Sequence, residues 1–318
     1  MMNELNDLKI VLATPRGFCA GVERAVGTLQ KAIDSFDCPV YVKHEVVHNK
    51  FIISDFKKKG VKFIEDIDLV PDNSILIYSA HGVSTEVKEA ARSKNLKIFD
   101  ATCPLVTKVH IEVHKHARND TDVVLIGHSG HPEIEGTMGQ YDSEKGKIHL
   151  VENENDVRDL KIDNENIAYV TQTTLSVNDT KKIINCLKEK YPEIRSPAKD
   201  DICYATQNRQ DAVSSIIKYC DFLIVIGSKN SSNSKRLAEL GSKNSIPSLL
   251  IDGKDDLDID LLKGKKVVGI TAGASAPEIL LTELLDYLVA HGAAIEDFGQ
   301  DNKTENITFS LPKELRNL

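Results

Sequence analysis

The sequence lacks the features that mark membrane proteins, disulfide-stabilised secreted proteins and general nucleic-acid binders. No stretch reaches the roughly 18 uninterrupted apolar residues of a membrane-spanning helix, and the N-terminal MMNELNDLKIVLAT has no basic segment followed by an apolar core. Its six cysteines include no C-x-x-C pair. The net charge of −8 argues against binding that relies on a general positive field. We therefore expect a cytoplasmic protein without a membrane or nucleic-acid partner, whose cysteines are structural, catalytic or metal-bound.

Apolar β-type runs repeatedly end in small polar residues and pass directly into a helical pattern. The pattern predicts an α/β fold with mostly parallel sheets, and the length of 318 residues predicts two or three domains. Ligands of such sheets bind beyond the carboxyl ends of the strands, so the polar turns are candidate site walls. The runs are SILIYSAHG, DVVLIGHSG, IAYVTQTT, FLIVIGSKNSS and VVGITAGAS.

One cysteine, Cys19, lies between two glycines in TPRGFCAGVERAV, where a strand pattern ends and a helix pattern begins. The unpaired N–H groups and the dipole of a helix N-terminus favour thiolate over thiol. A thiolate binds metal or acts as a nucleophile, so the residues alone leave both roles open for Cys19.

Two further cysteines have the same setting, Cys103 in IFDATCPLVTKV and Cys203 in DDICYATQNRQDAV. Three similar α/β domains, each offering one thiolate, are the economical interpretation. We predict domains at 15–102, 103–199 and 200–290, with strand 8–14 joining the third and 291–318 forming a C-terminal extension. The remaining cysteines are predicted to be structural: Cys38, Cys186 and Cys220.

Three converging thiolates are one ligand short of a closed zinc or [4Fe-4S] site. A cluster held in this way leaves one iron with an open position for a substrate oxygen. The alternative is that the three cysteines never meet and each is a core residue. A thiol phosphatase fits less well, because its C-x5-R spacing would place the arginine one position beyond Arg24.

Histidines and a carboxylate occupy the same predicted turns. His48 lies in EVVHNK, His81 in SAHGVS, and His128, His131 and Glu133 in GHSGHPEIEG. Imidazolium can donate to phosphate oxygens, and a neighbouring carboxyl can carry protons. For each histidine alone, a structural hydrogen-bonding role is the alternative.

The stretch SKNSSNSKR places Ser231, Ser232 and Asn233 directly after a predicted strand, where hydroxyl, amide and backbone donors suit a phosphate. An ordinary helix N-cap is the alternative. The P-loop pattern is absent, since Ser232 stands where its second glycine is needed. TQTTLS at 171–176 and Ser275 in GASAPE add further hydroxyl donors.

Together these motifs resemble the bacterial LytB family of 4-hydroxy-3-methylbut-2-enyl diphosphate reductases, and the resemblance runs through essentially the whole chain. It implies three α/β domains in a pseudo-threefold trefoil around a central iron–sulfur cluster. The motifs that carry it are PRGFCAGVERAV, VVHN, SAHGVS, DATCPLV, GHSGHPE, TQTTLS, CYATQNRQ, GSKNSSNS, GASAP and FSLPKELR.

The resemblance also implies roles for individual residues. Cys19, Cys103 and Cys203 would ligate a [4Fe-4S] cluster with one iron lacking a protein ligand, seen as [3Fe-4S] when that iron is lost. Glu133 would supply a proton, and Thr173, with Gln172 and Thr174, would position the substrate hydroxyl. His131 would also line the substrate pocket and is implied to be catalytic together with Glu133 and Thr173. The residues implied to surround the diphosphate are His48, His81, Ser231, Ser232, Asn233 and Ser275.

The implied activity is reductive dehydroxylation of (E)-4-hydroxy-3-methylbut-2-enyl diphosphate to isopentenyl and dimethylallyl diphosphate, the last step of the methylerythritol phosphate route to isoprenoids. Flavodoxin or ferredoxin is the implied electron donor. Two other classes stay open: a thiol-nucleophile enzyme acting on phosphate esters, and an iron–sulfur protein that only carries electrons or senses oxygen.

Overall fold

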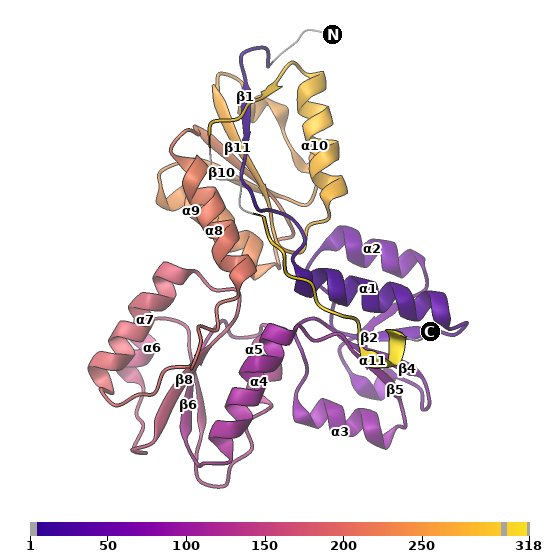
Figure 1. Ribbon diagram of the computed structural model, residues 1–318, viewed down its shortest axis with the longest axis vertical. Helices are drawn as coiled ribbons and strands as arrows, with labels where there is room; N and C mark the ends of the chain where they lie inside the picture. Colours follow the sequence, from indigo (N-terminus) through magenta and orange to yellow (C-terminus); the bar gives the residue numbers. More distant parts are fainter. Residues whose placement is uncertain (1–4, 300–303, 317–318) are drawn as a thin grey trace. The chain divides into compact units, whose positions relative to one another are not determined.

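The computed structural model describes residues 5–299 and 304–316 (Figure 1). Residues 300–303 and 317–318 of the predicted C-terminal extension lie outside this range. By its contacts the chain divides into two compact units, and each is described by itself. Within the described residues, the first unit comprises 5–20, 48–55, 204–299 and 304–308, and the second comprises 21–47, 56–203 and 309–316.

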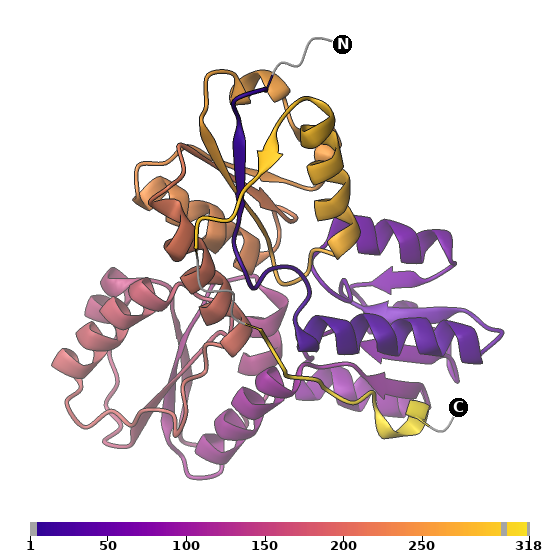
Figure 2. The ribbon, with the colours of Figure 1, turned by 45° about the horizontal axis from the view of Figure 1, so that its top comes forward.

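The first unit contains a five-stranded parallel sheet of order β10-β9-β11-β1-β12. The N-terminal strand β1, drawn in indigo, lies between two strands from the far end of the chain (Figure 2). The strands are β1 (Lys9–Leu12), β9 (Phe222–Ile226), β10 (Ser248–Ile251), β11 (Val267–Ala272) and β12 (Ala294–Ile295). The helices of this unit are α8 (Tyr204–Ile217), α9 (Ser232–Lys243) and α10 (Glu278–Ala290), and residues 50–55 of α2 (Lys50–Lys58) also belong to it.

Helices cover both faces of this sheet. Successive side chains of a strand point to opposite faces, so each buried strand packs against helices on both sides. In β9, Phe222 and its alternate neighbours pack against apolar residues of α10. Leu223 and Val225 pack on the other side, against α8 and against Leu237 of α9. A strand that is buried on both faces reads as a continuous apolar run, as FLIVI does.

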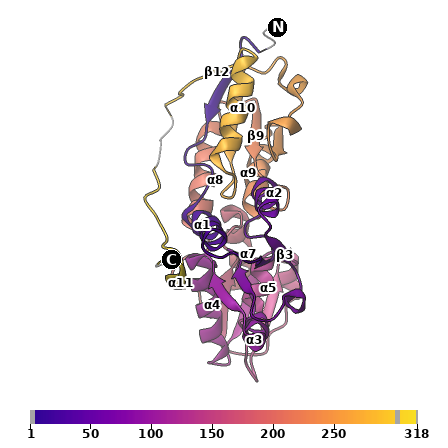
Figure 3. The same ribbon diagram turned by 90° about the vertical axis from the view of Figure 1, so that its right-hand side faces the viewer.

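The second unit contains a four-stranded parallel sheet of order β3-β2-β4-β5. Helix α3 packs on one face, where Ala91 joins the core that contains Tyr41 and Leu76. Helix α1 lies on the opposite side of these strands (Figures 1 and 3). The elements are α1 (Ala20–Ser35), β2 (Val40–Lys43), residues 56–58 at the end of α2, β3 (Lys62–Ile64), β4 (Ile75–Tyr78), α3 (Thr85–Ser93) and β5 (Lys97–Asp100).

A three-stranded parallel sheet of order β7-β6-β8 completes the second unit. Alternation in β6 again serves two cores, since Val124 and Ile126 face α6 and α7 while Val123 and Leu125 face α4 and α5. The elements are α4 (Pro104–Ala117), β6 (Asp122–Ile126), α5 (Pro132–Met138), β7 (Ile148–Val151), α6 (Glu154–Asp159), β8 (Ile167–Thr171), α7 (Val177–Lys190) and, near the C-terminus, α11 (Lys313–Arg316).

Three short 3-10 helices complete the described structure, at Ile67–Leu69, Lys254–Asp256 and Ile259–Leu262. Among residues 5–299 and 304–316, no helix combines the length and the apolar character that crossing a membrane requires.

The predicted α/β class with parallel sheets is confirmed, and so is the predicted sequence of strand, polar turn and helix. Each polar turn follows the carboxyl end of a strand and leads into the next helix. The domain boundaries near residues 102 and 199 stay a prediction. The turns are 79–84, 127–131, 172–176, 227–231 and 273–277.

Candidate active site

The three cysteines singled out by the sequence share one local structure, because each immediately precedes a helix. Cys19 precedes α1, Cys103 precedes α4 with Pro104 as its first residue, and Cys203 precedes α8. The backbone N–H of each donates to a carbonyl oxygen in a turn after a strand. All three thiols are half-buried. This position, held by backbone and close to a helix N-terminus, favours a thiolate that remains accessible to a ligand.

The acceptors of these three N–H groups are Ala274, Ala80 and Thr173. The N–O distances are 3.2 Å for Cys19, 2.9 Å for Cys103 and 3.0 Å for Cys203. The acceptors lie in the turns after β11, β4 and β8. Each cysteine is thereby fixed to the carboxyl edge of a sheet, where ligands of α/β proteins bind.

The other cysteines have different surroundings. Cys220 is buried, its thiol donates to the carbonyl oxygen of Ile216 at 3.2 Å, and burial raises its pKa to about 12. Cys186 lies in α7 and packs against the core that α7 shares with α6, and Cys38 is exposed. The thiol of Cys220 stays protonated at neutral pH, which fits the predicted structural role.

Glu133 is the carboxyl among the predicted site residues, and its pKa is strongly raised. Its side chain is only 4% exposed, and burial raises its pKa to about 7 against hydrogen bonds that favour the charged form. Its two oxygens accept from the backbone N–H of Thr173 at 2.6 Å and from the Thr173 hydroxyl at 3.1 Å. The carboxyl can therefore hold or release a proton near neutral pH.

His131 is the N-cap residue of α5, and its Nδ1 accepts from the backbone N–H of Glu133 at 3.1 Å. Its ring meets that of His81 edge to face, with 5.6 Å between the centroids. Residues from the turns after β4 and β6 thus meet in the second unit. The Nδ1 of His131 is an acceptor in this arrangement, so Nε2 is the atom able to donate to a ligand.

Gln172 orders the turn that carries Thr173. Its Oε1 accepts from the backbone N–H of His128 at 3.1 Å, and its Nε2 donates to the hydroxyl of Thr174 at 3.2 Å. His128 itself lies 3.4 Å from a carboxylate oxygen of Glu152. The two histidines in GHSGHPE thus have different partners: His131 accepts a hydrogen bond from the Glu133 backbone, whereas His128 lies beside Glu152.

In the first unit, the predicted phosphate donors surround the N-terminus of α9. Ser231 is its N-cap residue, with Oγ accepting from the backbone N–H of Ser234 at 3.3 Å. Ser232 and Asn233 follow, and both are buried. The Oδ1 of Asn233 accepts from the backbone N–H of Ala274 at 2.9 Å. This contact joins the first turn of α9 to the turn after β11.

His48 and Ser275 belong to the same group in the first unit. The hydroxyl of Ser275 donates to the carbonyl oxygen of His48 at 2.8 Å, and Nδ1 of His48 lies 3.4 Å from the side-chain amide of Asn230. Hydroxyl, amide and imidazole groups are thereby gathered beside a helix N-terminus, a combination suited to an anion.

The predicted site residues therefore form two groups, one in each unit. In the part of the chain that the structure describes, no three His, Cys, Asp or Glu side chains lie together as a metal-binding group. The first group is Cys19, His48, Ser231, Ser232, Asn233 and Ser275, and the second is His81, Cys103, His131, Glu133, Gln172, Thr173, Thr174 and Cys203.

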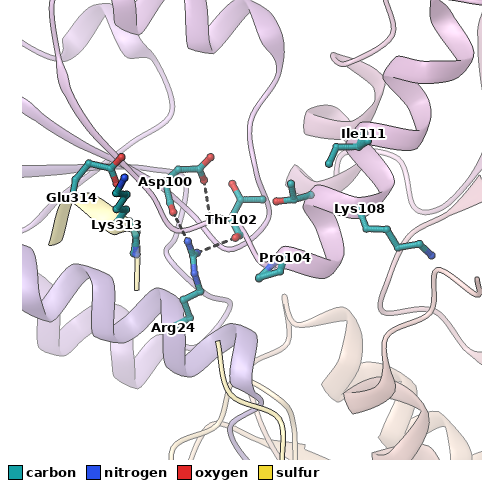
Figure 4. A pocket seen from close by; sticks show the side chains of 10 residues that line it. Arg24, Asp100, Thr102, Pro104, Lys108, Ile111, Lys313 and Glu314 are labelled. Carbon is teal, nitrogen blue, oxygen red and sulfur yellow. Dashed lines mark hydrogen bonds between the residues drawn. The ribbon is translucent and has the colours of Figure 1, made fainter. Parts of the chain in front are cut away.

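A cavity of about 540 Å³ lies in the second unit. It is lined by Thr102 and Pro104, the two neighbours of Cys103, and by Arg24, Lys108 and residues of α11 (Figure 4). None of the residues assigned to catalysis or substrate binding lines it, so the cavity lies outside the predicted substrate site.

Two polar residues of α8 support the Cys19 turn and were missed by the sequence analysis. The hydroxyl of Tyr204 accepts from the backbone N–H of Ala20 at 3.3 Å, and burial raises its pKa to about 12. Arg209 is fully buried and donates to the carbonyl oxygen of Gly17. The available signal was the position of Arg209, an arginine on the otherwise apolar face of a predicted helix.

Asp201 was also missed. It lies two residues before Cys203 and accepts from the backbone N–H of Thr171 at 2.9 Å. Its charge contributes to the raised pKa of Glu133, and its own pKa is raised by burial.

Comparisons with known proteins show the family to which the chain belongs. The family model described as LytB protein matches residues 10–289. A relative from Ectopseudomonas mendocina (strain ymp) is 56% identical over 311 residues, covering 97% of this chain and 99% of its own. One from Acinetobacter baylyi is 55% identical over 311 residues, covering 97% and 98%. Both relatives carry the name 4-hydroxy-3-methylbut-2-enyl diphosphate reductase.

Solved structures extend the similarity to the fold. The E-1-hydroxy-2-methyl-but-2-enyl-4-diphosphate reductase from Plasmodium falciparum is similar with a TM-score of 0.92 and 39% identity, covering 98% of this chain and 97% of that one. A second structure, of (E)-4-hydroxy-3-methyl-but-2-enyl diphosphate reductase, gives a TM-score of 0.65 at 32% identity, covering 89% and 99%. The family model and the relatives span nearly the whole chain, and the chain belongs to the LytB protein family.

Proposed function

We propose that this chain is a 4-hydroxy-3-methylbut-2-enyl diphosphate reductase. The reaction removes the allylic hydroxyl of the substrate as water, consumes two electrons and two protons, and leaves isopentenyl or dimethylallyl diphosphate. One proton leaves with the hydroxyl oxygen, and the other is added to carbon at one end of the allylic system. The names of the relatives support this activity, and the observation that carries it is the buried carboxyl of Glu133 bonded to Thr173.

Glu133 is proposed as the proton donor. An acid with a pKa of about 7 is roughly half protonated at neutral pH, which suits general-acid catalysis. The Thr173 hydroxyl donates to the Glu133 carboxylate; once Glu133 is protonated, the direction would reverse, with the carboxyl O–H donating to Thr173 and the Thr173 O–H donating onward. The pair can thus pass a proton to a substrate hydroxyl held beside Thr173, while Gln172 and Thr174 keep the turn in place.

The diphosphate is proposed to bind the donors around the α9 N-terminus, Ser231, Ser232, Asn233 and Ser275, together with His48. His81 and His131 would donate from the second unit. Within residues 5–299 and 304–316, Nδ2 of Asn233 is buried and has no hydrogen-bond partner. A buried amide donor beside a helix N-terminus is satisfied when an anion binds there.

The donor set fits an iron–sulfur cluster, and we propose Cys19, Cys103 and Cys203 as its protein ligands. All three are half-buried thiols next to helix N-termini, and Cys220, whose pKa burial raises to about 12, shows a thiol unsuited to ligation. When bound, a [4Fe-4S] cluster with three protein ligands supplies an open iron position, which acts as a Lewis acid toward oxygen, and a path for electrons. Loss of the open iron would give the [3Fe-4S] form.

We also propose that flavodoxin or ferredoxin supplies the electrons. Each of the three domains, bounded near residues 102 and 199, would contribute one of the cysteines.

The Glu133→Gln variant tests the proposal, and Glu135→Gln is its matched control. Glutamine keeps the size and can accept from the Thr173 N–H, but it cannot give up a proton. Glu135 is exposed two positions further along α5. After anaerobic reconstitution, Glu133→Gln should keep its iron and its spectral response to substrate while kcat falls about 100-fold or more. The control should keep wild-type kcat.

Normal turnover by Glu133→Gln would contradict the role of Glu133. An iron-free wild-type protein with full activity would instead support a thiol-nucleophile enzyme. An iron–sulfur spectrum that does not change when allylic diphosphate is added would support an electron carrier or sensor.

A further inference from the structure

Three basic residues occupy matching positions in the helices that follow the site cysteines. Arg24 lies in α1, Lys108 in α4 and Arg209 in α8, each five or six residues after the cysteine that precedes its helix. The side chain of each contacts the turn that leads to a different cysteine, and each contact lies inside one unit.

Arg24, in the helix after Cys19, binds the turn before Cys103. Its guanidinium donates to the carbonyl oxygens of Asp100 at 2.9 Å and Thr102 at 3.0 Å (Figure 4). Asp100 in turn accepts from the Thr102 N–H through its carboxylate at 2.9 Å. The residue immediately before Cys103 is therefore held through both its N–H and its carbonyl group.

Lys108, in the helix after Cys103, binds the turn before Cys203. Its ammonium donates to the carbonyl oxygens of Lys199 at 2.6 Å and Asp200 at 3.1 Å, and to the carboxylate of Asp201 at 3.0 Å. Three oxygens use the three N–H bonds of the ammonium. The side chain of Asp201 is fully buried, so Lys108 supplies a counter-charge for it.

Arg209, in the helix after Cys203, binds the turn before Cys19. It donates to the carbonyl oxygen of Gly17 at 2.7 and 3.1 Å and to that of Phe18 at 3.1 Å. Its side chain is completely buried, and Glu305 supplies the counter-charge at 3.1 Å. Gly17 has a φ of +69°, a conformation that residues with side chains rarely adopt. The turn that Arg209 binds therefore has a defined backbone conformation that favours glycine.

The three contacts form a closed series. The helix after Cys19 holds the turn of Cys103, the helix after Cys103 holds the turn of Cys203, and the helix after Cys203 holds the turn of Cys19. The described C-terminal segment takes part in two of them, since Glu305 pairs with Arg209 and the carbonyl oxygen of Ser310 accepts from Arg24 at 2.9 Å.

We propose that Arg24, Lys108 and Arg209 are positioning residues, each of which fixes the turn before one site cysteine from the helix that follows another. An iron–sulfur cluster requires its three protein ligands to be held in place together. Charge-assisted hydrogen bonds to the backbone can keep the turn before each cysteine in place even without the cluster. That these contacts serve cluster binding rests on the proposed function. Their effect on the reactivity of each thiol does not require a bound cluster.

The test replaces each basic residue in the full-length chain with methionine, which keeps most of the side-chain volume but removes the donors. The rate at which iodoacetamide alkylates each cysteine of the native, cluster-free protein is measured by peptide mass spectrometry. Lys115→Met is the matched control, because Lys115 is exposed on the same helix as Lys108. The control should leave all three rates at the wild-type value.

Each variant should accelerate alkylation of the cysteine whose turn has lost its contact, by about tenfold, as expected for one lost charge-assisted interaction. Arg24→Met should affect Cys103 although Cys19 is its nearest cysteine in the sequence. Lys108→Met should affect Cys203, and Arg209→Met should affect Cys19. Reconstituted variants should also lose iron to a chelator faster than wild type, and Lys108→Arg should restore both readouts.

An equal rise at all three cysteines, a rise at the nearest cysteine in the sequence, or no change would overturn the proposal. If Arg209→Met does not fold, Glu305→Gln removes the counter-charge that holds Arg209 in place, and Cys19 alone should become more reactive. A wild-type protein that binds no iron would refute the proposed function, whereas the pattern of alkylation would still decide the positioning role.

Discussion

The hydrogen bond between Thr173 and Glu133 gives a prediction about pH dependence. The Thr173 hydroxyl donates to the Glu133 carboxylate at 3.1 Å and so favours the charged form, lowering a pKa that burial has raised. Valine has nearly the shape of threonine but no hydroxyl. In Thr173→Val the carboxylate loses this donor, so the pKa of Glu133 should rise further, while the backbone N–H of residue 173 still donates.

The size of the shift follows from the bond. A hydrogen bond to a charged group contributes about 1.5–3 kcal/mol, and one pKa unit corresponds to about 1.4 kcal/mol, so the pKa should rise by about one unit or more. A general acid acts in its protonated form, and kcat should fall as pH rises through its pKa. The falling limb should therefore lie near 7 in wild type, where the pKa of Glu133 is about 7, and about one unit higher in Thr173→Val.

The assay is kcat from pH 5.5 to 9.5 under anaerobic conditions with saturating substrate and a fixed chemical reductant. Because Thr173 is also proposed to position the substrate, the plateau will fall, and the informative quantity is the position of the limb. Thr174→Val is the control, since its hydroxyl accepts a hydrogen bond from Nε2 of Gln172. A Thr173→Val limb that stays at the wild-type pH, or moves to lower pH, would refute the assigned hydrogen bond.

Two further predictions concern the cluster ligands and the phosphate site. Serine in place of any one of the three proposed cluster ligands should deplete iron after anaerobic reconstitution, measured by iron analysis, while Cys38→Ser should retain it; equal iron contents would reject the sorting of the cysteines. Ser231→Ala should weaken substrate binding roughly 10- to 100-fold by calorimetry and lower stability by about 1 kcal/mol through loss of the N-cap. Ser242→Ala, near the other end of α9, should do neither, and unchanged affinity in Ser231→Ala would remove that serine from the site.

Local features of the fold could be predicted from the sequence because they depend on near neighbours. Gly17 interrupts the strand before Cys19, Pro104 favours a helix start after Cys103, and the apolar spacing after Cys19 and Cys203 has a helical period. These patterns predicted that each cysteine precedes a helix, and the structure confirms it. The alternation of apolar strands with polar turns similarly predicted parallel sheets, because strands buried on both faces are apolar throughout.

Charge states and long-range partners depended on the tertiary structure. The pKa of Glu133 is set by burial and by Thr173, 40 residues away, and no local pattern encodes that contact. Sequence chemistry alone left His128 and His131 equivalent, whereas the structure bonds His131 to the Glu133 backbone and places His128 beside Glu152.

The sequence by itself determined which cysteines begin helices and which turns carry donors, because helix and strand periods and chain-breaking residues act over a few positions. Only the tertiary structure decided that Arg209 lies fully buried over the Cys19 turn and that Arg24 reaches Thr102, 78 residues away. A buried charge is tolerated only where distant groups supply its partners, and those partners are brought together by folding rather than by sequence proximity.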